Sequence, residues 1–222
     1  MIQKNTLRFL SELEKNNNRE WFSENKEAYE KAKDDFTDLV QKIIDSISKF
    51  DPSLKDLKAK NCVFRIYRDV RFSKNKMPYK TYFGASFSAG GKKSNLAGYY
   101  LHIEDKNSFL AGGKWMPESA DLAAIRQEID YNREAFLKII SSPVFLRSFA
   151  SLSDENKLQT APKGYPKNHP LVEILKLKSF VAIHSFANKN ILDPAFAKEC
   201  AALCKLLYTF NNFLNEAIAN ES

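Results

Sequence analysis

The segment RIYRDVRFSKNKMPYKT, residues 65–81, holds the densest group of side chains that could bind a ligand. It contains three arginines and three lysines against a single acid, Asp69, which leaves +5 of the +7 net charge of the chain. Arginine presents a planar fork that suits two oxygens of a phosphate or carboxylate, and lysine adds a point charge. We therefore expect an anion-binding site for a small ligand, formed by Arg65, Arg68, Arg71, Ser73, Lys76, Tyr79 and Lys80.

A strand over residues 62–72 would divide these side chains between two faces. Arg65, Asp69 and Arg71 would lie on a polar face, whereas Arg68 would fall on the apolar one. Like charges two residues apart repel unless an anion lies between them, and Asp69 offsets only part of that cost. A second interpretation stays open, in which the arginines pair with acids of the first long helix and the face is ordinary solvated surface.

Proton transfer would need an acid or base near this segment, and we consider three candidates: His169, Asp69 and Tyr100. Three prolines stiffen the loop 162–170 around His169, and a histidine with a pKa near 6.5 suits proton transfer. Tyr100, His102 and Glu104 alternate along GYYLHIE and should share one strand face. Each histidine has an ordinary structural role as its alternative. Candidate pocket-lining residues are Trp21, Trp115, His102 and Lys163.

The elements that must position these residues follow from the hydrophobic pattern. Apolar residues at helical spacing predict a short helix from Thr6, a long one from Trp21 to Ile47, another over 119–140 and a last one from Asp193. Alternating or β-branched runs predict about five strands, at 62–72, 83–88, 98–104, 109–111 and 181–186. The expected fold is a single α+β domain over 1–222, with a mainly antiparallel or mixed sheet covered by helices. Its parts would be helical 1–60, sheet-rich basic 61–118, and 119–222 with helices and one strand.

Several functions lack sequence support. GxGxxG, GxxxxGK[ST], GxSxG and HExxH are missing, and the three cysteines form no CxxC or Cys/His cluster, so we expect neither a cofactor nor a metal. The cysteines should be small core residues. The sequence contains no apolar run long enough for a membrane span or a signal peptide, which predicts a soluble cytoplasmic protein without a membrane partner.

Five blocks of this sequence resemble the family catalogued as domain of unknown function 2461. They are an FLxxLxxNNxREWFxxNKxxY element at Phe9–Tyr29, the block FRIYRDVRFSKNKMPYKT at 64–81, a YYLHI strand, the turn GGKWMP and the segment PKGYPKNHP at 162–170. The resemblance implies no established activity. It marks the same segments that charge and stiffness single out, and it adds Asn17, Arg19, Glu20 and Trp21 to the residues of interest.

Three functional hypotheses remain. The first is a protein that binds a phosphate- or carboxylate-bearing small molecule, with or without catalysis. The second is a nucleic-acid-binding protein that uses the basic block and its interleaved aromatic residues, among them Tyr67, Phe72 and Tyr82. The third is a structural or interaction domain without a ligand.

Overall fold

A computed structural model describes residues 1–219 of the chain. These residues form two compact units, each assembled from separate stretches of sequence. Unit 1 comprises Met1–Ser94, Tyr100–Leu110 and Ser185–Ala202, and unit 2 comprises Asn95–Tyr99, Ala111–His184 and the chain from Leu203 onward. The division does not follow the boundaries suggested by composition, and the expectation of one domain over 1–222 stays a prediction.

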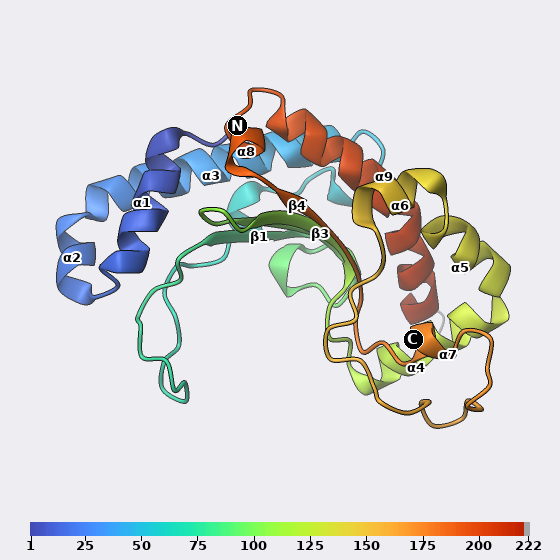
Figure 1. The fold of residues 1–222 in the computed structure, drawn as a ribbon. Coiled ribbons are helices and arrows are strands. Elements are labelled where there is room, and N and C mark those ends of the chain that lie inside the picture. Colours follow the sequence, from blue (N-terminus) through green and yellow to red (C-terminus); the bar gives the residue numbers. More distant parts are fainter. Residues whose placement is uncertain (220–222) are drawn as a thin grey trace. The chain divides into compact units, whose positions relative to one another are not determined.

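Unit 1 is built on a long helix whose apolar face is buried, as its sequence spacing predicts. Its helices are α1 (Lys4–Lys15), α2 (Arg19–Glu24), α3 (Lys26–Ile47), α8 (Asn188–Ile191) and the start of α9 (Phe196–Ala219). Phe36 of α3 is fully buried and stacks on Phe83 at 5.4 Å between ring centroids. The helix expected from Trp21 to Ile47 is interrupted at Asn25, whose side-chain amide donates to the carbonyl of Trp21. Figure 1 shows the long α3 beside the shorter α1 and α2.

Unit 2 packs its helices around a cluster of phenylalanines. The helices are α4 (Ser119–Tyr131), α5 (Arg133–Ile140), α6 (Pro143–Phe149), α7 (Val172–Leu175) and the remainder of α9. The rings of Phe136 and Phe213 lie 5.2 Å apart, and those of Phe145 and Phe210 lie 5.9 Å apart. The single helix expected over 119–140 is divided at Asn132 into α4 and α5.

The sheet is antiparallel, with the order β1-β2-β3-β4. Its strands are β1 (Phe83–Phe87), β2 (Gly98–Ile103), β3 (Ser108–Lys114) and β4 (Phe180–Phe186), and three short 3-10 helices lie at Pro52–Leu54, Ala59–Asn61 and Gly91–Lys93. The α+β class with helical ends is therefore confirmed. The expected number of about five strands is too high for residues 1–219, because the stretch 62–72 does not form a regular strand.

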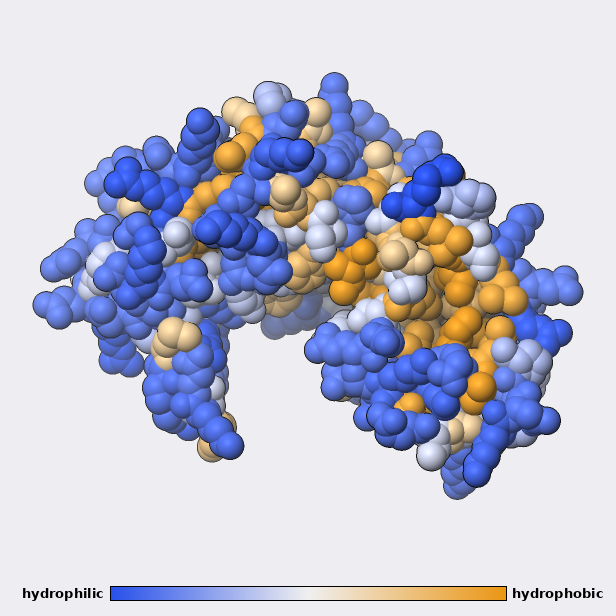
Figure 2. Space-filling view, viewed as in Figure 1, coloured by the Kyte–Doolittle hydropathy of each residue, from blue (hydrophilic) through white to orange (hydrophobic). Residues whose placement is uncertain are grey.

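Residues 65–80, here termed the basic arm, instead form an irregular hairpin that extends away from β1 (Figure 1). Isolated antiparallel bridges join Val63 to Ala85 and Tyr67 to Tyr79, and the N–H of Arg68 donates to the carbonyl of Pro78 at 2.9 Å. Proline has no N–H to return such a bond, so the ladder stays incomplete. In Figure 2 the arm is hydrophilic over most of its surface, with a small hydrophobic area at its end.

Two further expectations from the sequence concern the burial of the cysteines and the presence of membrane-spanning helices. Cys62, Cys200 and Cys204 are buried and form no disulfide within residues 1–219, as expected of core residues. Within residues 1–219, every helix is too short or too polar to cross a bilayer.

Candidate functional site

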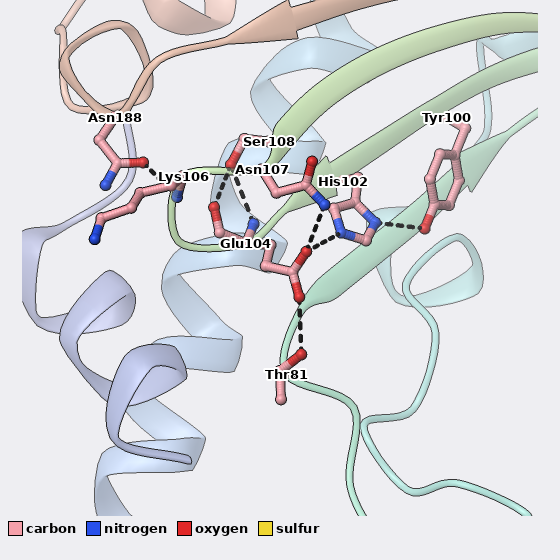
Figure 3. A network of polar contacts seen from close by, with 8 residues as sticks. All are labelled: Thr81, Tyr100, His102, Glu104, Lys106, Asn107, Ser108 and Asn188. Carbon is pink, nitrogen blue, oxygen red and sulfur yellow. Dashed lines mark hydrogen bonds and ion pairs between the residues drawn. The ribbon is translucent and has the colours of Figure 1, made fainter. Parts of the chain in front are cut away.

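Strand β2 and the residue after it carry a chain of three hydrogen-bonding side chains on one face (Figure 3). The Tyr100 hydroxyl lies 3.2 Å from Nδ1 of His102, and Nε2 of His102 lies 3.4 Å from Oε2 of Glu104. An ionised carboxylate can only accept hydrogen bonds, so the neutral ring donates from Nε2 and accepts the Tyr100 proton at Nδ1. The alternation in GYYLHIE thus placed these side chains on one face correctly.

Glu104 is held in place by donors from separate segments of unit 1. Thr81 Oγ1 donates to one carboxylate oxygen at 2.8 Å, and Asn107 Nδ2 donates to the other at 2.8 Å. The turn between β2 and β3 is itself tethered, because the backbone N–H of Lys106 donates to the side chain of Asn188 at 2.9 Å (Figure 3). A carboxylate restrained in this way orients the histidine and would stabilise its protonated form. Sequence reasoning placed Glu104 on this face but did not find Thr81 or Asn107.

Aromatic rings enclose His102. Phe109 stacks on its ring at 4.7 Å and Tyr82 lies at 4.2 Å, and the residue is buried. Burial lowers the pKa of His102, although the carboxylate of Glu104 acts in the opposite direction. Burial also raises the pKa of the Tyr100 hydroxyl, helped by Tyr82 and Glu104. At neutral pH the chain therefore holds a neutral base beside a protonated phenol.

Gly84 of β1 gives the Tyr100 hydroxyl its position. A Cβ on Gly84 would come within 2.6 Å of that hydroxyl, which is closer than real Cβ contacts allow. Glycine at position 84 is thus a condition for the hydrogen bond between the Tyr100 hydroxyl and His102.

Lys80, at the base of the basic arm, places a positive charge beside this chain. Its ammonium lies 5.5 Å from the centroid of the Phe64 ring and 5.7 Å from that of Tyr82, the ring that also contacts His102. Burial lowers the pKa of Lys80, and the nearby Arg65 guanidinium adds to the effect. Among residues 1–219, no carboxylate oxygen lies within 4.0 Å of the Lys80 or the Arg65 nitrogens. The two cations therefore repel each other, and Asp69, which is ion-paired with Arg71 and interacts with Arg65 over a longer distance, offsets only part of this repulsion.

The other predicted anion-binding residues already have partners or lie elsewhere on the arm. Arg71 forms a two-pronged ion pair with Asp69, at 3.0 and 2.7 Å, and this pairing lowers the pKa of the Asp69 carboxyl. Arg68 donates to the carbonyl of Met77 at 3.3 Å, and Lys76 donates to that of Val70 at 3.1 Å. Ser73 is half-buried near the end of the arm.

Tyr79 is buried against the N-terminal helices. Its ring stacks on Phe22 of α2 at 3.9 Å, and the side chain of Asn17 bonds to its backbone. Trp21, a predicted pocket residue, stacks on Phe9 of α1 at 6.0 Å. Asn18 accepts from the N–H of Trp21 and caps α2. The N-terminal block noted in the resemblance thus anchors the base of the arm.

Three further predicted residues belong to unit 2. Nε2 of His169 lies 2.8 Å from Asp130, a partner that the sequence did not indicate, and its Nδ1 accepts from the N–H of Leu171. Both ring nitrogens are thus engaged within the loop, and the catalytic role of His169 stays a prediction. Trp115 and Lys163 are exposed. No group of three or more potential metal ligands occurs in residues 1–219.

The five blocks of the resemblance lie between Phe9 and position 170, and a family match covers a comparable part of the chain. The model of a family described as conserved hypothetical protein (DUF2461) covers residues 5–213. The chain belongs to this family. No curated protein and no solved structure matches it. The family description assigns no activity, so the DUF2461 chain must be interpreted through the geometry of its site.

Proposed function

We propose that the chain binds a small molecule bearing a phosphate or carboxylate at the base of the basic arm, and that Tyr100, His102 and Glu104 transfer a proton to or from it. The main support is that neither the half-buried Lys80 ammonium nor the exposed Arg65 guanidinium forms a direct ion pair with a carboxylate of residues 1–219, although both lie beside a hydrogen-bonded Tyr–His–Glu chain. An anion would relieve the repulsion between the two cations.

The division of roles follows from the contacts. Lys80 and Arg65 would bind the anionic group, and the adjoining faces of Phe64 and Tyr82 would contact the body of the ligand. Tyr100 would take up a proton from the ligand while passing its own hydroxyl proton to Nδ1 of His102, and Glu104 would stabilise the resulting imidazolium; the reverse steps would return the proton to the ligand. This arrangement supports general acid–base chemistry on an anionic molecule, and it leaves the arm residues Arg71 and Asp69 outside the reaction.

Thermal-shift measurements with inorganic phosphate and with a library of phosphate monoesters and small carboxylates test the binding step. At least one compound should raise the melting temperature of the wild type, and Lys80→Ala should abolish that response whereas Lys80→Arg retains part of it. Lys93→Ala is the matched control, because Lys93 is an exposed lysine of the same unit and should leave the response unchanged.

The same ligand then serves to test the proton-transfer step. Nitrogen NMR of the histidine rings is tractable because the chain has 3 histidines. The bound ligand should shift the His102 resonances and leave those of His169 in place. If no compound stabilises the wild type, or if Lys80→Ala responds as the wild type does, the proposed site is wrong and an interaction domain without a small ligand becomes the better description.

A further inference from the structure

The outer part of the basic arm presents an aromatic ring that the fold does not use. Phe72 is 95% exposed, the highest exposed fraction of any large hydrophobic side chain within residues 1–219. The guanidinium of Arg71 lies 5.9 Å from the centroid of its ring. Tyr67 is 47% exposed on the same arm, although it also contacts Phe22. Exposed aromatic faces of this kind are costly in water and suit stacking against a planar partner.

Cations accompany these rings along the whole arm. Between residues 65 and 80 the sequence has three arginines, three lysines and one acid, Asp69, which gives a local charge of +5. Asp69 is ion-paired with Arg71. Lys74, two positions after Phe72, is exposed. The surface is therefore complementary to a partner with both negative charge and flat apolar rings.

Hydrogen bonds hold the arm in shape before any partner arrives. Lys76 donates to the carbonyl of Val70 at 3.1 Å across the hairpin, and the side chain of Asn75 accepts from the N–H of Met77 at 2.9 Å. Ordering these groups in advance reduces the entropy lost on binding.

We infer that the basic arm binds single-stranded nucleic acid, with a base stacked on Phe72 and phosphates along the arginines and lysines. The distribution of charge selects this partner. At about 3.3 Å per residue, Arg65 and Phe72 can be separated by at most roughly 23 Å along the arm. A flat anionic membrane would meet the end of the arm alone, whereas a linear polyanion reaches cations at both its base and its end. Paired bases in a duplex offer no free face, which favours a single strand.

Fluorescence anisotropy with a labelled 12-nucleotide oligo-dT and oligo-rU, measured over a series of salt concentrations, tests the inference. The full chain should bind both oligonucleotides and should bind a matched duplex more weakly. Phe72→Ala should weaken binding by between about fivefold and a hundredfold, the range expected for one stacked base. Lys74→Gln should reduce the magnitude of the salt slope by about 0.7, the value for one phosphate contact.

Tyr131→Ala is the control, because Tyr131 is another exposed ring, at 75%, on unit 2. It should leave oligonucleotide affinity unchanged. Phe72 contributes little to the core, so its alanine variant should keep the wild-type melting temperature and also the wild-type response to the small anion of the β2 face. The response to the small anion therefore tests the proposed small-ligand site separately from the binding of nucleic acid by the arm.

Three results would overturn the inference. One is the absence of oligonucleotide binding even at low salt. Another is an equal loss of affinity in Phe72→Ala and Tyr131→Ala. The third is binding to vesicles containing phosphatidylserine, dependent on Phe72, without binding to the oligonucleotides, which would assign the arm to a lipid surface instead.

Discussion

The side-chain amide of Asn17 pairs with both backbone groups of Tyr79. Its Nδ2 donates to the Tyr79 carbonyl at 3.0 Å, and its Oδ1 accepts from the Tyr79 N–H at 3.1 Å. A neighbouring β-strand would make the same two bonds, so the loop between α1 and α2 substitutes for a strand at the base of the arm. Phe22 reinforces the junction by stacking on the Tyr79 ring.

Replacement of Asn17 by alanine should therefore destabilise unit 1. The variant leaves the N–H and carbonyl of the buried Tyr79 without these partners, and we expect the free energy of unfolding to fall by about 1–3 kcal/mol. Urea denaturation followed by circular dichroism measures the change. Asn168→Ala is a suitable comparison, since Asn168 is exposed in unit 2 and its side chain makes no hydrogen bond within residues 1–219, and it should unfold at the wild-type midpoint. Equal midpoints for the two variants would show that the Asn17 pairing contributes nothing.

The burial of His102 predicts a dependence of stability on pH. Its pKa in the folded chain lies below the ordinary value of 6.5, so the unfolded chain binds more protons as the pH falls below 6.5. The contribution of neutral His102 to stability is complete above that pH and is lost progressively below it. Urea unfolding between pH 5 and pH 8 should show this loss in the wild type and a smaller loss in His102→Gln.

Glu104→Gln tests the cause of that dependence. The carboxylate of Glu104 favours the protonated ring, so its removal should lower the pKa of His102 further and make the loss of stability in acid larger. His169 and His184 remain in all these variants, and their contributions cancel in the comparison. An identical pH profile for the wild type and His102→Gln would mean that His102 is not desolvated as the structure indicates.

The segment GGKWMP, expected to be a turn, begins inside β3, and its Gly113 is required for two reasons. Gly113 has a φ of 125°, and a Cβ there would overlap the carbonyl oxygen of Phe180 on β4 and press on the ring of Phe210. Gly113→Ala should therefore prevent stable folding of unit 2 or lower its melting temperature strongly. Gly164→Ala isolates the backbone component, because Gly164 also has a positive φ, 92°, but a methyl group there would meet no atom of residues 1–219 within 4 Å. It should cost only about 1–2 kcal/mol. Similar melting temperatures for the two alanine variants would exclude the overlap with Phe180.

Local patterns in the sequence predicted the local parts of the fold and site. Helical spacing identified the buried face of α3, and alternation in GYYLHIE placed Tyr100, His102 and Glu104 together. The apolar spacing continues across Asn25 and Asn132, so it did not predict that the helices are interrupted there. Along the arm, the predicted polar face of Arg65 and Arg71 is exposed, but a regular strand would have placed Phe72 on the opposite, apolar face, and Phe72 is exposed because the pairing is irregular.

Contacts between distant residues could not be predicted from one sequence. Thr81 lies 23 positions from Glu104, and Asn17 lies 62 positions from Tyr79. The pairing of Arg71 with Asp69 is the opposite case, since the two residues are close in sequence and Asp69 was expected to offset part of the arginine charge; the alternative, pairing with acids of the first long helix, is not seen for Arg71. The sequence indicated the cluster of arginines, but only the structure showed which of the cations form an ion pair with a carboxylate.

The tether between Asn188 and the turn after β2 also constrains how the protein is made. Asn188 bonds to both Asp105 and Lys106, and the carbonyl of Ile191 accepts from the N–H of Ile2. A ribosome releases residues 1–110 long before these later partners emerge. The nascent chain can assemble α3 and β1 early, but the turn that restrains Glu104 acquires its tether only after Asn188 has emerged. Chains that terminate prematurely before residue 188 would therefore carry the Tyr–His–Glu sequence without its finished support.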